Sequence, residues 1–410
     1  MTSPASGSPP SERAVLVFST VLFLIPALAL TTRVGITLAE LAVLAGSLWY
    51  GKRLWRERHA LFGPARGMML AIVAHVVLAI LSLILSGMDP RFLENPLRAL
   101  LMLPLVGLVA IGRPKSDWFW YGLFVGTIGA ALLAAYQRFG LHVDRAEGFH
   151  MAITFGDTAM AMALMSLAGV ARFAGTRLAL LPLLAFVAGV VASILSGTRG
   201  GWMALVLSFI PLVSHGRHAI GRRVIAFGLA GIFLLAGASL FPELGVRKRF
   251  EAIATDMTEY RSGNSNTSIG LRFENWKGGV MIFKEHPLTG IGRANYERGI
   301  NELVARGVLP PETAGLRHAH NELLNAFATQ GIIGGLSMIF LYAAPFAFFT
   351  RRLRHDPDCR PVALAGLLLV LSYIDFGLTQ VLFVHHIGSA FYIIMTSVLA
   401  GLCINSGRLR

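Results

Sequence analysis

Long apolar segments separated by short polar connections recur along almost the whole chain. Between Ala14 and Asn405 these segments are about 15 to 22 residues long, and roughly 20 apolar residues cross a bilayer as a helix. The pattern therefore predicts an all-α polytopic membrane protein with about twelve transmembrane helices. They are expected at 14–31, 34–50, 67–87, 97–112, 118–138, 151–171, 178–196, 201–215, 224–241, 328–349, 362–383 and 387–405.

Composition supports this interpretation. The chain has 410 residues, of which 55% are hydrophobic and only 14% charged, against about 25% charged in an ordinary soluble domain. These values exclude a soluble enzyme, a disordered tail and a disulfide scaffold. The polar segment 1–13 precedes an apolar run without a small-residue cleavage site, so we expect an uncleaved first helix.

The formal charge of +14 reflects topology. Connections on the side of the two termini contain 19 Lys and Arg, whereas the short connections on the other side, with the adjoining helix ends, contain six. The positive-inside rule then places both termini in the cytoplasm of a bacterial inner membrane. The basic charge consequently indicates no nucleic-acid partner. Cys359 and Cys403 fall on the cytoplasmic side, where thiols stay reduced, and no disulfide is expected.

One connection, 242–327, is much longer than the others and divides the chain. We expect nine helices in 1–241, a large helical periplasmic loop in 242–327 and three helices in 328–410. An apolar stripe with helical spacing, Ile269, Phe273, Trp276, Val280 and Phe283, predicts a helix over about 271–285. Further helices are expected over about 296–306 and from Asn321 to Thr329, which continues into the tenth span.

Two arginines on the sparsely charged side are candidates for binding an anionic ligand. Arg199 lies in SGTRGGW (196–202), where glycines allow close approach of a ligand, and Arg272 lies in GLRFENWKGG (270–279). The alternatives are a snorkelling anchor for Arg199 and a solvated or headgroup-facing side chain for Arg272. Two planar guanidinium groups can each hold a phosphate bidentately, which favours an anion site.

His318 and His320 in LRHAHNELLNAF (316–327) precede the helix that enters the membrane. No Cys or carboxylate at standard spacing completes a ligand set with them, so no metal is expected. A histidine with an ordinary pKa near 6.5 suits a general base, although a structural hydrogen-bonding role is the alternative.

Weaker substrate-binding candidates accompany these residues. Asp157 and Asp375 are carboxylates inside predicted spans, where ionisable groups are costly and are functional suspects; the alternative is an internal hydrogen bond or an ion pair with Arg138 or Arg145. The other weak candidates are Arg145, Arg293 and Trp276. For the two arginines, solvated or lipid-headgroup contacts are the simpler interpretation.

The order of the motifs SGTRGGW, GLRFENW, HPLTGIGRANY and HAHNELLNAFATQGIIG resembles the O-antigen ligase and O-antigen polymerase superfamily, and the ligases most closely. The resemblance covers the second half of the chain in motifs and the whole chain in architecture. It implies a GT-C-like membrane fold and metal-independent, inverting glycosyl transfer without a cofactor. It also implies an undecaprenyl-diphosphate-linked O-antigen donor and a lipid A-core acceptor, within membrane lipid. His320 matches the family's essential histidine, Arg199 and Arg272 match its essential arginines, and His318 matches a less strict position.

The sequence is also compatible with other functions. An O-antigen polymerase would use the same polyprenyl donor, and a protein O-oligosaccharyltransferase would usually carry a further extracytoplasmic region after the last span. Twelve spans with intramembrane charges also describe secondary transporters. Against a transporter, no repeat is detectable, and the arginines and the histidine are all expected at one membrane face.

Overall fold

The computed structural model describes residues 10–86, 92–208, 222–241 and 246–406, and within these ranges it contains helices and no strands. The longer helices of the first half are α1 (Glu12–Leu28), α2 (Gly35–Arg56), α3 (Arg58–Phe62), α4 (Arg66–Leu85), α5 (Glu94–Leu101), α6 (Leu105–Gly112), α7 (Ser116–Ala135), α8 (Ala152–Phe173), α9 (Leu181–Ser196) and α10 (Arg199–Leu207). Those of the second half are α12 (Arg222–Ala238), α13 (Val246–Arg261), α14 (Ser268–Glu285), α15 (Tyr296–Ala305), α16 (Glu322–His355), α17 (Arg360–Phe376) and α18 (His386–Ser406).

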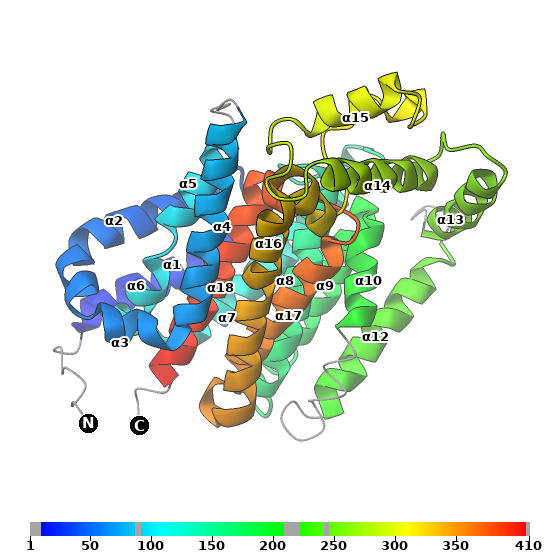
Figure 1. The fold of residues 1–410 in the computed structure, drawn as a ribbon. Helices are drawn as coiled ribbons and strands as arrows, with labels where there is room; N and C mark the ends of the chain where they lie inside the picture. The colour runs from blue at the N-terminus through cyan, green and yellow to red at the C-terminus, as the bar shows by residue number, and fades with distance from the viewer. Residues whose placement is uncertain (1–9, 87–91, 209–221, 242–245, 407–410) are drawn as a thin grey trace.

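Most of these helices form one bundle (Figure 1). Both termini lie at one end of the bundle, and α14 and α15 lie across the opposite end. Helix α8 is at the centre, and nearly all of its side chains are buried. Its sequence is rich in Ala and contains two Gly, and such small residues let neighbouring helices approach closely. The predicted fold class, an all-helical polytopic membrane protein, is thereby confirmed.

Seven helical segments in the described ranges are long and apolar enough to cross a bilayer. They are Arg58–Leu85, Glu94–Gly112, Ser116–Gly140, Ala152–Phe173, Glu322–His355, Pro357–Phe376 and His386–Ser406, and Leu181–Ser196 is a shorter apolar helix. Each predicted span overlaps a helix, although the end of the expected 201–215 span lies outside the described residues. The total of twelve spans stays a prediction.

The expected helices of the long connection are present. Helix α14 matches the one expected over 271–285, α15 matches the one over 296–306, and α16 begins where the third was expected. Helix α13 was not predicted. Helix α14 buries Glu274, Asn275, Gly278, Gly279 and Ile282 rather than its apolar stripe, and Val280 of the stripe is 41% exposed. The rest of the stripe is half-buried, and Phe283 packs against Phe327 of α16 with ring centroids 5.3 Å apart.

A glycine-rich loop after α14 packs against a break in α16. Gly331 has φ 65° and ψ −163°, values outside the helical region. The amide N–H of Gly292 donates to the carbonyl of Thr329, and that of Ile332 donates to the carbonyl of Pro287. A Cβ atom at Gly331 would lie 2.2 Å from the carbonyl oxygen of Leu288. Only glycine fits here, because both the backbone conformation and the close approach exclude a side chain.

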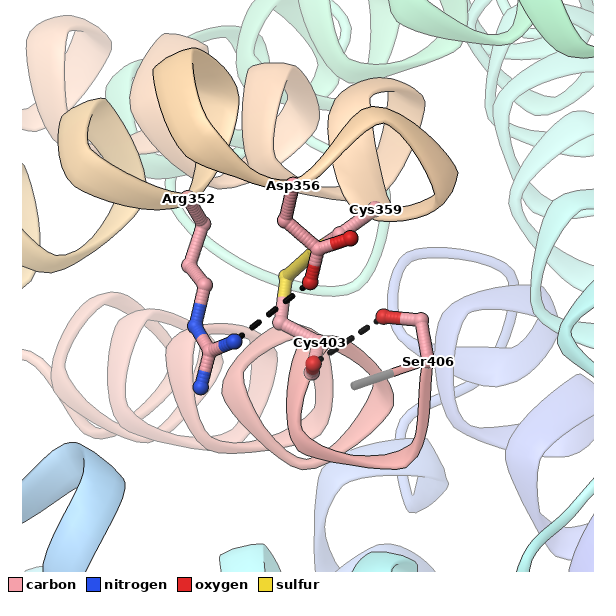
Figure 2. Close-up of a disulfide and its surroundings, with 5 residues drawn as sticks. All are labelled: Arg352, Asp356, Cys359, Cys403 and Ser406. Carbon is pink, nitrogen blue, oxygen red and sulfur yellow. Dashed lines mark hydrogen bonds and ion pairs between the residues drawn. A yellow bond between two sulfur atoms is a disulfide. The ribbon is translucent and has the colours of Figure 1, made fainter. Parts of the chain in front are cut away.

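The expectation that both cysteines are free thiols is wrong in this structure. Cys359 and Cys403 form a disulfide (Figure 2). Cys359 lies directly before α17 and Cys403 near the end of α18, and packing of these helices brings their Cα atoms to 5.4 Å. The sequence placed both residues at one membrane face but did not show that they are adjacent.

Candidate active site

A polar cavity of about 230 Å³ lies at the end of the bundle away from the termini. Its lining brings together Arg145, Arg199 and Arg272, with the carboxylate of Asp157. These residues come from the connection before α8, the start of α10, α14 and α8 itself. The cavity therefore assembles three guanidinium groups that are more than 100 positions apart at the extremes of the sequence.

The backbone around Arg199 is fixed by small residues. Gly197 ends α9 in the left-handed region, with φ 65°, and the hydroxyl of Thr198 donates to the carbonyl of Ala152 over 3.0 Å. A Cβ atom at Gly201 would lie 3.2 Å from Oδ1 of Asp157. The glycines of the SGTRGGW motif thus let the start of α10 pass close to α8, which places Arg199 at the cavity.

Positive charge is concentrated in this cavity. Arg145 donates from Nε to the carbonyl of Ser196 over 2.8 Å, and Arg199 contacts the hydroxyl of Ser268 at 3.4 Å. Burial and the nearby charge of Arg199 lower the pKa of Arg272. Burial lowers the pKa of Arg145, and the charge of Arg199 acts in the same direction, against the opposing charge of Glu147. A divalent anion would relieve this repulsion, because three cations face one carboxylate in a partly desolvated space.

His320 lies beside the cavity in an unusual backbone conformation. Its φ is +48°, which is uncommon for a residue with a side chain and is often found at functional sites. Its Nδ1 atom is 3.0 Å from Oε1 of Gln380. The preceding residue, Thr379, lines the arginine cavity. An amide oxygen only accepts hydrogen bonds, so this contact places the ring proton on Nδ1 and leaves Nε2 as the acceptor.

Two further histidines surround His320. The ring of His318 is 4.3 Å from that of His320 and 6.2 Å from that of His385, measured between centroids. Burial, then the neighbouring His320 and His385, lowers the pKa of His318 to about 4. Burial and the charge of Arg272 also lower the pKa of His320. Both rings are therefore neutral at neutral pH, the form that a general base requires.

The segment after α17 holds His320 in place. The amide N–H of Glu322 donates to the carbonyl of Gly377 over 2.7 Å. The carboxylate of Glu322 accepts from the amide N–H of Phe383 over 3.1 Å. On the other side, the side-chain amide of Asn275 in α14 donates to the carbonyl of His318. The segment from His318 to Glu322 is thereby hydrogen-bonded to α14 on one side and to residues 377–385 on the other.

The weaker candidates separate into two groups. Arg145 and Asp157 line the cavity together, and Arg138 donates to the carbonyl of Val143. Asp375 is buried near the cavity but is not part of its lining, and neither are Arg293 and Trp276. In the described parts of the chain, no group of three His, Cys, Asp or Glu could hold a metal ion.

The fold and this cavity define a multi-pass helical membrane protein with a cationic site at one end of its bundle. Residues 184–339 match the family model described as O-antigen ligase. This segment contains Arg199, Arg272, His318 and His320. This part of the chain is thus similar to the O-antigen ligase superfamily, which supports the resemblance predicted from the motifs.

Two relatives illustrate the range of similarity. A Haemophilus influenzae protein described as uncharacterized is 27% identical over 319 residues, which cover 76% of this chain and 80% of the relative. An O-antigen ligase of Escherichia coli K12 is 28% identical over 156 residues, which cover 37% of this chain and 34% of the ligase. Similarity to this family supports a membrane glycosyltransferase of the ligase or polymerase type.

Proposed function

We propose that this protein is an O-antigen ligase. It transfers O-antigen polysaccharide from undecaprenyl diphosphate to a sugar hydroxyl of lipid A-core at the periplasmic face of the inner membrane. The observation that carries the proposal is the cavity of three arginines next to a neutral, positioned His320. The family match and the likeness to the Escherichia coli ligase support the substrate class.

The arginines bind the donor diphosphate. Departure of the diphosphate from the anomeric carbon concentrates negative charge on its oxygens. Arg199 and Arg272, assisted by Arg145, neutralise that charge inside a cavity that is only partly hydrated. Fixed cations in such a site stabilise developing charge more strongly than water does.

His320 is the general base. Its Nε2 atom accepts the proton of the acceptor hydroxyl while the hydroxyl oxygen attacks the anomeric carbon. The bond from that carbon to the diphosphate breaks at the same time, and the diphosphate leaves with the electron pair. A single displacement inverts the anomeric configuration and needs neither a covalent enzyme intermediate nor a metal ion.

The proposal includes a topology. Twelve spans with cytoplasmic termini place α13, α14, α15 and the arginine cavity on the periplasmic side. A GT-C-like architecture, in which membrane helices carry a catalytic cap at one end, is consistent with α14 and α15 across the bundle (Figure 1). The donor lipid would then enter the cavity laterally, from the membrane.

Lipopolysaccharide profiles of cells test the acceptor. A Gram-negative strain that lacks its ligase and has a matched core is complemented with the wild-type chain or with His320→Ala, at equal membrane expression. The wild type should restore the O-antigen ladder on lipid A-core, and His320→Ala should leave polyprenyl-linked O-antigen unused. A wild-type chain that instead restores chain growth in a polymerase-deficient strain would show that the acceptor assignment is wrong and the protein is a polymerase.

A further inference from the structure

A second cavity, of about 500 Å³, lies far from the arginines between α1, α2 and α6. Figure 1 shows these three helices together at the edge of the bundle, on the side away from α13. The lining is almost entirely apolar, and its deepest residues, Leu22, Val43 and Val109, are buried. Its outer edge is open, because Val17 is 60% exposed and Trp49 is 80% exposed. We call this cavity the α1–α2 groove.

The groove runs along most of α1. On α1 its lining extends from Arg13 to Ile25, a helical rise of about 18 Å. The hydrocarbon core of a bilayer is about 30 Å thick, so one leaflet is about half of that. The groove therefore begins at the start of α1, which the proposed topology puts at a membrane face, and its length is comparable with the thickness of one leaflet. An acyl chain of one leaflet fits this length, whereas a membrane-spanning helix does not.

The end of the groove at the membrane face is cationic and aromatic. Arg13, Trp49, Tyr50 and Pro114 line it there. Pro114 is flanked by Arg113 and Lys115, which are both exposed. Basic side chains at a membrane face attract anionic lipid headgroups, and Trp and Tyr prefer the headgroup region. The basic and the aromatic residues at this end of the groove therefore both favour an anionic lipid headgroup as its occupant.

We propose that the α1–α2 groove is a binding site for an anionic phospholipid. One acyl chain lies along α1, and the phosphate lies beside Arg13 and the exposed cations around Pro114. The site is separate from catalysis, since the arginine cavity is lined by residues of α8, α10 and α14, of the adjoining connections and of the segment after α17, none of which lines the groove. It is therefore independent of the proposed ligase function.

Native mass spectrometry of the purified full chain tests this site. The protein is incubated with phosphatidylglycerol or with phosphatidylcholine, and the bound fraction of each is measured. The wild type should retain phosphatidylglycerol preferentially. Arg13→Gln should reduce that retention about fivefold, the effect of about 1 kcal/mol per basic side chain near a membrane surface. Arg177→Gln, at an exposed arginine outside the groove, should leave it unchanged.

A second pair of variants tests the apolar part. Ala45 lines the groove, and Leu48 on the same helix is 78% exposed and does not. Ala45→Phe should fill the groove and abolish retention of both lipids, whereas Leu48→Phe should retain them. Equal binding of the two lipids by the wild type, or equal losses in a groove variant and its control, would overturn the proposal. A dimer that dissociates in Ala45→Phe would identify a second copy of the chain as the occupant instead.

Discussion

Gln380 is the residue on which the proposed proton transfer most depends besides His320 itself. Its amide oxygen fixes the Nδ1 proton of His320 and so orients Nε2. Gln380→Leu should lower kcat roughly tenfold, because the ring loses its orienting partner. Gln380→Glu should retain more activity and move the acidic limb of the pH profile upward, since a carboxylate stabilises the protonated ring. A wild-type rate and profile in both variants would exclude this positioning role.

The charge of Arg272 should set the pH dependence. Neutral His320 is the base, so activity rises as pH increases through its pKa. Burial and Arg272 lower that pKa, which places the acidic limb below pH 6.5. In Arg272→Gln the residual activity should therefore fall off at a higher pH than in the wild type. An acidic limb that stays in place would show that Arg272 does not influence the base.

Both arginines should be required as arginines. Arg199→Lys and Arg272→Lys keep the charge but lose the bidentate fork that matches a phosphate. Each should reduce transfer about 100-fold, comparable with the loss of one donor to a developing anion. The control Arg261→Lys changes an exposed arginine of α13 and should leave the rate of transfer unchanged. Near-normal ligation by either active-site lysine variant would contradict the diphosphate role.

The charged residues of the site can be predicted from the sequence, but the residues that hold them in place cannot. Arg199, Arg272 and His320 stand out because they lie in glycine-rich or interfacial motifs on a side that is otherwise poor in positive charge. Gln380 and Glu322 carry no such signal, because their role depends on contacts 60 residues apart in the sequence. Gln380 lies near the end of the predicted span 362–383 and Glu322 just before the span 328–349, and a polar residue near a span end is too common to single out.

At the scale of the elements, the join between the glycine-rich loop and α16 should control how the cap is placed. Gly331→Ala introduces a Cβ atom against the carbonyl of Leu288 in a backbone region that only glycine adopts. The substitution should cost about 1–3 kcal/mol from backbone strain alone, lower Tm and reduce transfer. Gly307→Ala is the matched control: it also has positive φ, but its Cβ would meet no atom within 4 Å. Similar losses of activity in both variants would argue against a specific role for the join.

Hydrophobic periodicity predicted most helices because membrane spans need long apolar segments. It was less informative for α14, because apart from Ile282 its buried residues are Gly or polar. One of these polar residues, Asn275, accepts at Oδ1 a hydrogen bond from the hydroxyl of Tyr296. Helix α13 was missed because its sequence is strongly polar. The break at Gly331 depends on the approach of a distant loop, which no local pattern reveals.

At the scale of the whole molecule, the proposed orientation in the membrane can be tested by labelling. The two cysteines are the only ones in the sequence, so Cys359→Ala with Cys403→Ala gives a cysteine-free background. Ser262→Cys and Arg177→Cys then place single thiols at exposed positions near opposite ends of the bundle. A membrane-impermeant maleimide should label Ser262→Cys in cells with a permeabilised outer membrane, and Arg177→Cys only after the inner membrane is disrupted. The reverse pattern would invert the topology and place the arginine cavity in the cytoplasm.

The most direct measurement of the central claim is transfer by the purified protein in the presence of excess chelator. The donor is undecaprenyl-diphosphate-linked O-antigen, the acceptor is lipid A-core, and the product is resolved by size. We predict O-antigen joined to lipid A-core with inverted anomeric configuration, and a loss of about 100-fold or more in His320→Ala. Failure to form this product without a divalent ion, or elongation of the donor in place of modification of lipid A-core, would contradict the assignment as a metal-independent O-antigen ligase.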